Sequence, residues 1–205
     1  MLTIKEYPNW LINEGSISSL PMDDVINKKF LDIVLSDSYN RESLIYQYMH
    51  EEGISDESEV DEEEFSDWVK YELDYLASEF ITKVNTDLIK NGKIKIWRAM
   101  SVNKEWESRL QTEAKHLGIY WSWDQEGAEP HWGYNMELPF TTIMEAEVDE
   151  TSVDWYPTIR LNTEPVSFEE KEIRLVKGAK IKIVSIKIDD KEIDLSDISG
   201  DRFIA

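Results

Sequence analysis

Apolar residues recur with helical spacing through residues 61–90. They fall three or four residues apart and so share one face of a helix: Phe65, Trp68, Val69, Leu73, Leu76, Phe80, Val84 and Leu88. Asn91-Gly92 follows directly and is typical of a helix end. The same spacing predicts a shorter helix near residues 23–35. Residues 1–92 are therefore expected to form a helical region.

The pattern changes from Lys93 onwards, where apolar and polar residues alternate as they do in strands. Strands are predicted for "KIKIWRAM" at 93–100, "IYWSW" at 119–123 and "TTIMEAEV" at 141–148, with a further short one near "KEIDL" at 191–195. A helix is expected at 103–118, with Asn103 as its N-cap and Gly118 just beyond its end. Helices followed by short strands predict an α+β fold, with residues 93–205 as the second region.

Residues 168–188, "FEEKEIRLVKGAKIKIVSIKI", predict a β-hairpin that turns at Lys177-Gly178. Because side chains alternate along a strand, Glu170 and Glu172 are expected to share one face, while Ile173 points to the core. Two like charges on one face repel each other. Either they are solvated and paired with lysines across the hairpin, or they serve a function.

The chain has 205 residues and a formal net charge of −21, and 41% of its residues are apolar. This apolar content is typical of a folded protein. The absence of cysteine excludes disulfides, thiol catalysis and thiolate metal sites. The three histidines lack metal-ligand spacing, so no metal is expected. No apolar run is long enough to span a membrane and no signal pattern is visible, which predicts a cytoplasmic protein.

Acidic residues are concentrated in the first part of the chain, and nine of them fall within residues 50–65, a stretch without lysine or arginine. This charge disfavours direct nucleic-acid binding, because binding to a nucleic-acid backbone requires clustered lysine and arginine. It favours encounter with basic partners. The acidic stretch is interpreted either as a solvated loop or as a docking surface that imitates a phosphate backbone.

Two further positions suggest a binding site. Arg98 continues the apolar face of its strand, so it must reach solvent, pair with a glutamate, or bind a phosphate or carboxylate with its planar guanidinium. Tyr120 and Ser122 share a strand face, and a loop carrying Trp132 follows. An aromatic side chain exposed in this loop would be suited to stacking on a flat heterocycle, whereas Trp121 and Trp123, on the other strand face, are interpreted as core packing.

Taken in order, "WRAM", "GIYWSWD" and "EKEIRLVKGAKIKIVSI" resemble the arginine–serine–glutamate class of ADP-ribosyltransferases, over about residues 93–188. The resemblance implies an ADP-ribosyltransferase-like split β-sandwich, following an N-terminal helical region. It also implies NAD as co-substrate and the transfer of ADP-ribose to a macromolecule. A glutamate at position 170 tends to accompany arginine as the acceptor in this family, so a protein arginine is the expected target.

The same resemblance implies a role for each site residue. Arg98 would hold the pyrophosphate or the adenosine-side ribose of NAD, and Ser122, with Tyr120, would shape the nicotinamide-ribose pocket. Glu172 would bond the ribose 2′-hydroxyl and stabilise the cation that forms as nicotinamide leaves. Glu170 would orient or deprotonate the acceptor, and Trp132 or Tyr134 would pack near nicotinamide.

The family motif usually carries a second hydroxyl residue after the serine, whereas Trp123 and Asp124 follow Ser122 here. Two alternatives to a transferase remain open from the sequence. One is NAD hydrolysis, with water as the acceptor. The other is a non-enzymatic acidic protein that imitates nucleic acid or inhibits a partner on a transferase scaffold. Small size and acidity suit a bacterial or phage effector.

Overall fold

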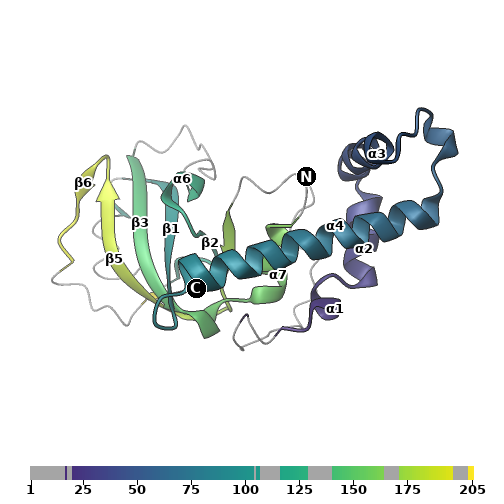
Figure 1. Cartoon of the computed structure of the whole chain (residues 1–205). Helices are drawn as coiled ribbons and strands as arrows, with labels where there is room; N and C mark the ends of the chain where they lie inside the picture. The colour runs from purple at the N-terminus through teal and green to yellow at the C-terminus, as the bar shows by residue number, and fades with distance from the viewer. Residues whose placement is uncertain are drawn as a thin grey trace.

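The computed structural model describes residue 17 and residues 20–103, 105–106, 116–128, 140–163, 171–195 and 203–205. Helices dominate the first part of the chain and antiparallel strands the second, which confirms the α+β class. In Figure 1 the first three helices lie beside the N-terminal half of the long helix α4 (Glu62–Lys83), and the sheet lies near the C-terminal end of that helix.

The helices of the first part are α1 (Met22–Val25), α2 (Lys28–Ser36), α3 (Ser38–Glu52) and α4 (Glu62–Lys83). A π-helical turn at Val84–Leu88 extends α4, so the helix predicted at 61–90 is confirmed. The helix predicted at 23–35 is divided in two, because the Asn27 side chain caps α2 by accepting the N–H of Phe30 at 3.0 Å.

The acidic stretch 50–65 is only partly a loop. It begins in α3, passes through a 3₁₀ turn at Glu57–Glu59 and ends in the first turn of α4. Asp61 caps α4 by accepting the N–H groups of Glu63 and Glu64. Carboxylates at this helix end also interact favourably with the helix dipole. Several of these charges therefore have a local structural role.

The strands of the second part are β1 (Lys93–Val102), β2 (Tyr120–Ser122), β3 (Phe140–Asp149), β4 (Glu172–Arg174), β5 (Lys180–Ile188), β6 (Lys191–Glu192) and β7 (Phe203–Ile204). Their order is β4-β2-β1-β3-β5-β6, and β7 pairs with β5. All the pairs are antiparallel. Short helices α6 (Gln125–Ala128) and α7 (Trp155–Leu161) follow β2 and β3. The helix expected at 103–118 lies largely outside the described residues.

The hairpin predicted for residues 168–188 is wrong. The turn at Lys177-Gly178 exists, but β4 pairs with β2 and β5 pairs with β3, on the other side of β1. Alternation along a strand predicts which side chains are buried, but not which neighbour satisfies the backbone hydrogen bonds. Pairing of Glu172 with lysines across a hairpin is therefore excluded.

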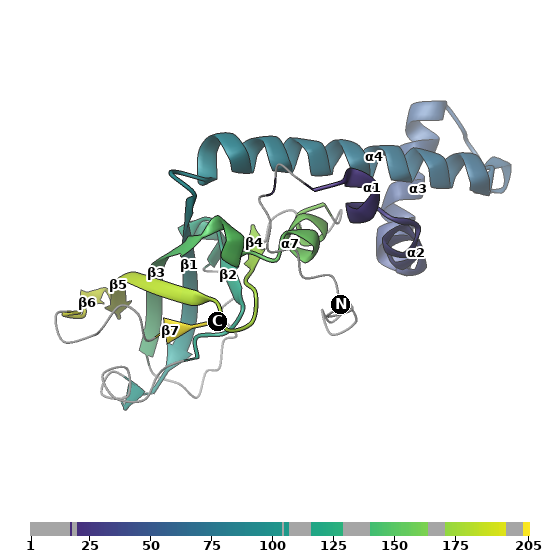
Figure 2. The same ribbon diagram turned by 90° about the horizontal axis from the view of Figure 1, so that it is seen from below.

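One contiguous apolar core joins the helices to the sheet. Phe30 of α2, Phe65 of α4, Trp155 of α7 and Phe203 of β7 are among its largest fully buried side chains. Helix α7 contacts α4 and β4, as Figure 2 shows from below. The division of the chain at residue 92 remains a prediction, but the helical region is packed against the strands that carry the candidate site.

Candidate active site

The strands that carry Arg98, Ser122 and Glu172 lie side by side, in the order β1, β2, β4. Ser122 is the direct cross-strand partner of Glu172. On its other side Ser122 pairs with Trp97, the residue before Arg98. Residues 74 positions apart in the sequence therefore lie within three adjacent strands, with Ser122 in the middle.

Arg98 is packed against the backbone of β2. Its Nη1 donates to the carbonyl oxygen of Tyr120 at 2.8 Å, and its guanidinium lies 6.0 Å from the centre of the Trp121 ring. Gly118, at φ +83°, gives the guanidinium room, because a Cβ there would lie 2.7 Å from Nη1. Burial lowers the pKa of Arg98, and the charge of Glu172 opposes this shift. The two side chains therefore interact electrostatically.

Ser122 joins the end of β2 to the start of β4. Its hydroxyl donates to the carbonyl oxygen of Lys171 at 3.1 Å and accepts the N–H of Asp124 at 3.2 Å. The residue is buried, and Gly127 of α6 lies so close that a Cβ there would be 2.7 Å from Oγ. The hydroxyl therefore fixes the backbone beside Glu172.

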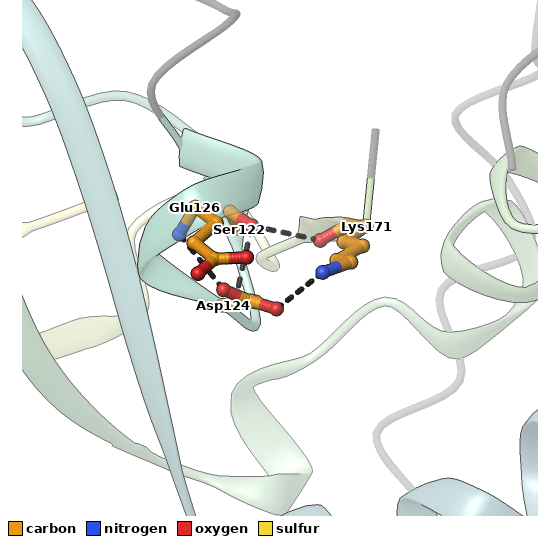
Figure 3. Close-up of polar contacts among 4 residues, drawn as sticks. All are labelled: Ser122, Asp124, Glu126 and Lys171. Atoms are coloured by element: carbon orange, nitrogen blue, oxygen red, sulfur yellow. Dashed lines mark hydrogen bonds and ion pairs between the residues drawn. The ribbon is translucent and has the colours of Figure 1, made fainter. Parts of the chain in front are cut away.

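Lys171 and Asp124 form an ion pair next to this hydroxyl (Figure 3). The hydrogen bond from Lys171 lowers the pKa of Asp124. Asp124 also accepts the N–H of Glu126 at 2.8 Å, which fixes the first turn of α6. The sequence pattern did not indicate Lys171, because a lysine between two glutamates is typical of an exposed strand.

Glu172 is 7% exposed, although a glutamate in this position was expected on a cleft or on a solvated face. Tyr120 lies on the adjacent strand β2 and Arg98 on the next strand, β1, and the charge of Glu172 acts on both. Burial is the main cause that raises the pKa of Tyr120. A buried carboxylate beside a guanidinium is suited to stabilising a cation in a ligand.

Glu170, the expected acceptor-side carboxylate, and Trp132, the expected nicotinamide neighbour, lie outside the described residues. Their roles remain predictions. Glu172, Arg98, Ser122 and Tyr120 are described, and they lie on three neighbouring strands.

A cavity of about 540 Å³ lies between α4 and the β2 and β4 ends. It is lined by Leu76, Glu79, Phe80, Lys83, Trp123, Asn162 and Lys171. The Lys83 ammonium lies 4.5 Å from the centre of the Trp123 ring, and the Phe80 ring meets that ring edge-on at 5.6 Å. Trp123 and Lys171 directly adjoin Ser122 and Glu172 in the sequence, so the cavity is next to the candidate residues. Helical spacing predicted Phe80 as core, and nothing in the sequence indicated Asn162.

Asp154 forms a second polar cluster behind β4. Its carboxylate lies 3.7 Å from Nε of Arg174, and the residue is 5% exposed. Burial raises the pKa of Asp154 to about 6, and attraction to Arg174 and Arg160 only partly opposes this shift.

The stability of the protein should therefore depend on Asp154 between pH 4 and 6. The unfolded chain loses this proton near pH 3.8 and the folded chain near pH 6, so the free energy of unfolding falls as the pH rises between these values, by about 3 kcal/mol. Denaturant titrations of the wild-type protein and the Asp154→Asn variant at several pH values measure the difference. Asp149→Asn, at an exposed position, is the control. Parallel profiles for wild type and Asp154→Asn would contradict the assignment.

Within the described residues, no cluster of histidine, cysteine or acidic side chains has the geometry of a metal site. Among the same residues, no helix is both long and apolar enough to cross a membrane. No family model matches the chain, and neither a curated protein nor a solved structure matches it.

Proposed function

We propose that the protein is an NAD-dependent mono-ADP-ribosyltransferase, with a transferase-like split β-sandwich and a protein arginine as the acceptor. The observation that carries the proposal is the adjacency of β1, β2 and β4, because it gathers Arg98, Ser122 and Glu172 in one small region. The sequence predicts the same three residues as an ordered set.

The chemistry of the side chains fits NAD. Arg98 offers a planar cation, which suits a pyrophosphate or ribose hydroxyls. Glu172 offers a buried carboxylate that can accept the ribose 2′-hydroxyl. The cavity beside them is large enough for a heterocycle, and its walls combine aromatic rings with two lysines.

In the proposed reaction, the bond between ribose C1′ and the nicotinamide nitrogen breaks, and its electron pair leaves with nicotinamide. Glu172 stabilises the positive charge that develops on the ribose. A nitrogen of the acceptor then forms a bond to C1′ and loses a proton, which Glu170 accepts. Ser122 contributes indirectly, because its hydroxyl fixes the backbone that leads into Glu172.

The acceptor is a basic protein. The helices α3 and α4 present four exposed tyrosines, Tyr39, Tyr46, Tyr71 and Tyr75, in the most acidic part of the chain. Tyrosine is enriched in protein interfaces, and its ring attracts cations. The same surface supports a second candidate function, a non-enzymatic acidic protein that occupies the basic surface of a partner.

An assay with labelled NAD distinguishes the transferase from the non-enzymatic acidic protein. The purified protein is incubated with labelled NAD and a cell lysate, beside the Arg98→Ala and Glu172→Gln variants, and both label transfer and nicotinamide release are followed. Label on a macromolecule that both variants fail to produce supports the transferase. Nicotinamide release without label indicates an NAD glycohydrolase. Neither product, across several lysates, overturns the enzyme and favours the acidic binding protein.

A further inference from the structure

The strand that carries Glu172 lies at one edge of the sheet, and polar groups of α7 and of the residues that flank it cover that edge. The N–H of Arg174 donates to Oγ1 of Thr158 at 3.1 Å, and the N–H of Asp154 donates to the carbonyl oxygen of Arg174 at 2.9 Å. Beside them, Nδ2 of Asn162 donates to the carbonyl oxygen of Glu172 at 2.6 Å. Helix α7 therefore takes the place of a neighbouring strand along β4.

Asn162 is well suited to hold a backbone in place. It is 3% exposed, and its second amide bond goes to the carbonyl oxygen of Thr158 at 2.7 Å. Both amide hydrogens are therefore used, one on α7 and one on β4, so the side chain links the two elements directly. A buried side chain bound at two points has little freedom to rotate.

The residue before Glu172 has a strained backbone. Lys171 has φ +47°, in the left-handed region that non-glycine residues rarely adopt. Its carbonyl oxygen accepts the hydroxyl of Ser122 at 3.1 Å and the N–H of Trp123 at 3.0 Å. Such strain persists only where the surroundings impose it, and it is concentrated at functional sites. The backbone at 171–172 is thus held from β2 on one side and from α7 on the other.

We propose that Asn162 is a positioning residue for the Glu172 carboxylate, acting through the carbonyl oxygen of Glu172 and not through contact with the substrate. This inference rests on the proposed function, in which Glu172 stabilises the charge on the ribose. Catalytic groups must be held within about 0.5 Å of their productive position. Without the Asn162 bond, β4 keeps its pairing with β2 and its bonds at Arg174, but loses the bond that holds its outer edge at Glu172.

The test compares Asn162→Leu, which keeps the approximate size of the side chain but removes both donors, with Thr163→Val. Thr163 is the next residue and is also fully buried, but its hydroxyl donates within the end of α7, to the carbonyl oxygen of Arg160. In Asn162→Leu, kcat for nicotinamide release should fall by about 10–100-fold, since small displacements have effects of this size. KM for NAD should stay within about twofold of the wild-type value. Thr163→Val should change neither constant, although it lowers the melting temperature.

Asn162 also lines the cavity, so direct contact with the ligand is the alternative role for this side chain. The kinetic constants distinguish that role from positioning of Glu172. A raised KM with an unchanged kcat would mean that Asn162 contacts the ligand, and the proposal would be overturned. The same conclusion would follow if Asn162→Leu and Thr163→Val had equal kcat values. If Asn162→Leu does not fold, Asn162→Ala, which also removes both donors, is measured in its place with the same expectations.

Amide hydrogen exchange across residues 171–174 requires no substrate. It therefore tests the positioning role of Asn162 even if the protein is not the proposed enzyme. Exchange should be faster in Asn162→Leu than in Thr163→Val or the wild-type protein. Unchanged exchange overturns the positioning role. If exchange is faster but the wild-type protein releases no nicotinamide, the proposed enzyme fails while the link from Asn162 to β4 is supported.

Discussion

The Glu172→Gln protein should fold normally and release nicotinamide from NAD at least about 10²-fold more slowly than the wild-type protein. Glutamine has nearly the same shape as glutamate, and the backbone oxygen at position 172 still accepts the Asn162 bond. The negative charge that acts on Arg98 and Tyr120 is lost. Because that charge is proposed to stabilise the ribose cation, both transfer and cleavage should be lost.

The matched control is Glu145→Gln on β3. Glu145 also belongs to a strand of the sheet and also pairs with a cation, since its carboxylate lies 2.8 Å from Nζ of Lys95. It is outside the candidate site, so this variant should keep full activity. Glu170→Gln adds a second comparison, because it should lose transfer but retain some cleavage. Full activity in Glu172→Gln would rule out the mechanism.

Most of the fold could be predicted from local patterns. The long helix α4 and the strands β1 and β3 were predicted from periodicity alone, because each buries a continuous face over 10 residues or more. Helix α3 was predicted only as an unspecified part of the helical region 1–92, and helix α7 was not predicted. Tyr39 and Tyr46 are exposed on α3 and weaken its apolar pattern, and α7 is buried throughout and so has no polar face.

For the candidate site, the sequence predicted which residues belong to it and that they lie on strands, but not how those strands are arranged. The order of Arg98, Ser122 and Glu172 along the chain did not reveal that their strands are neighbours, and the hairpin expectation would have put β4 beside β5. Sheet order depends on contacts between distant segments, which local alternation does not encode. For the same reason, Lys171 and Asn162 were not identified: their roles come from single hydrogen bonds across the fold.

The Arg160→Met protein should lose about 3–5 kcal/mol of its free energy of unfolding, since bonds from a charged donor contribute about 1.5–3 kcal/mol each. Arg160 is 6% exposed, and it joins α7 to the helical region. Its Nε donates to the carbonyl oxygen of Val25 at 2.6 Å and its Nη2 to that of Asp24 at 2.9 Å. Methionine retains the apolar packing but leaves the two oxygens at the end of α1 without these donors.

Arg41→Met is a close control for this substitution. Both arginines lie over a phenylalanine ring, Arg160 at 5.1 Å from Phe30 and Arg41 at 5.6 Å from Phe65. Arg41, however, pairs with exposed carboxylates on Glu57 and Glu62, and such pairs contribute at most about 1 kcal/mol. Urea titrations of both variants measure the two losses. If Arg160→Met loses no more than Arg41→Met, Arg160 does not connect the helical region to α7. A larger loss means that α7, which also supports β4, depends on the helices before it.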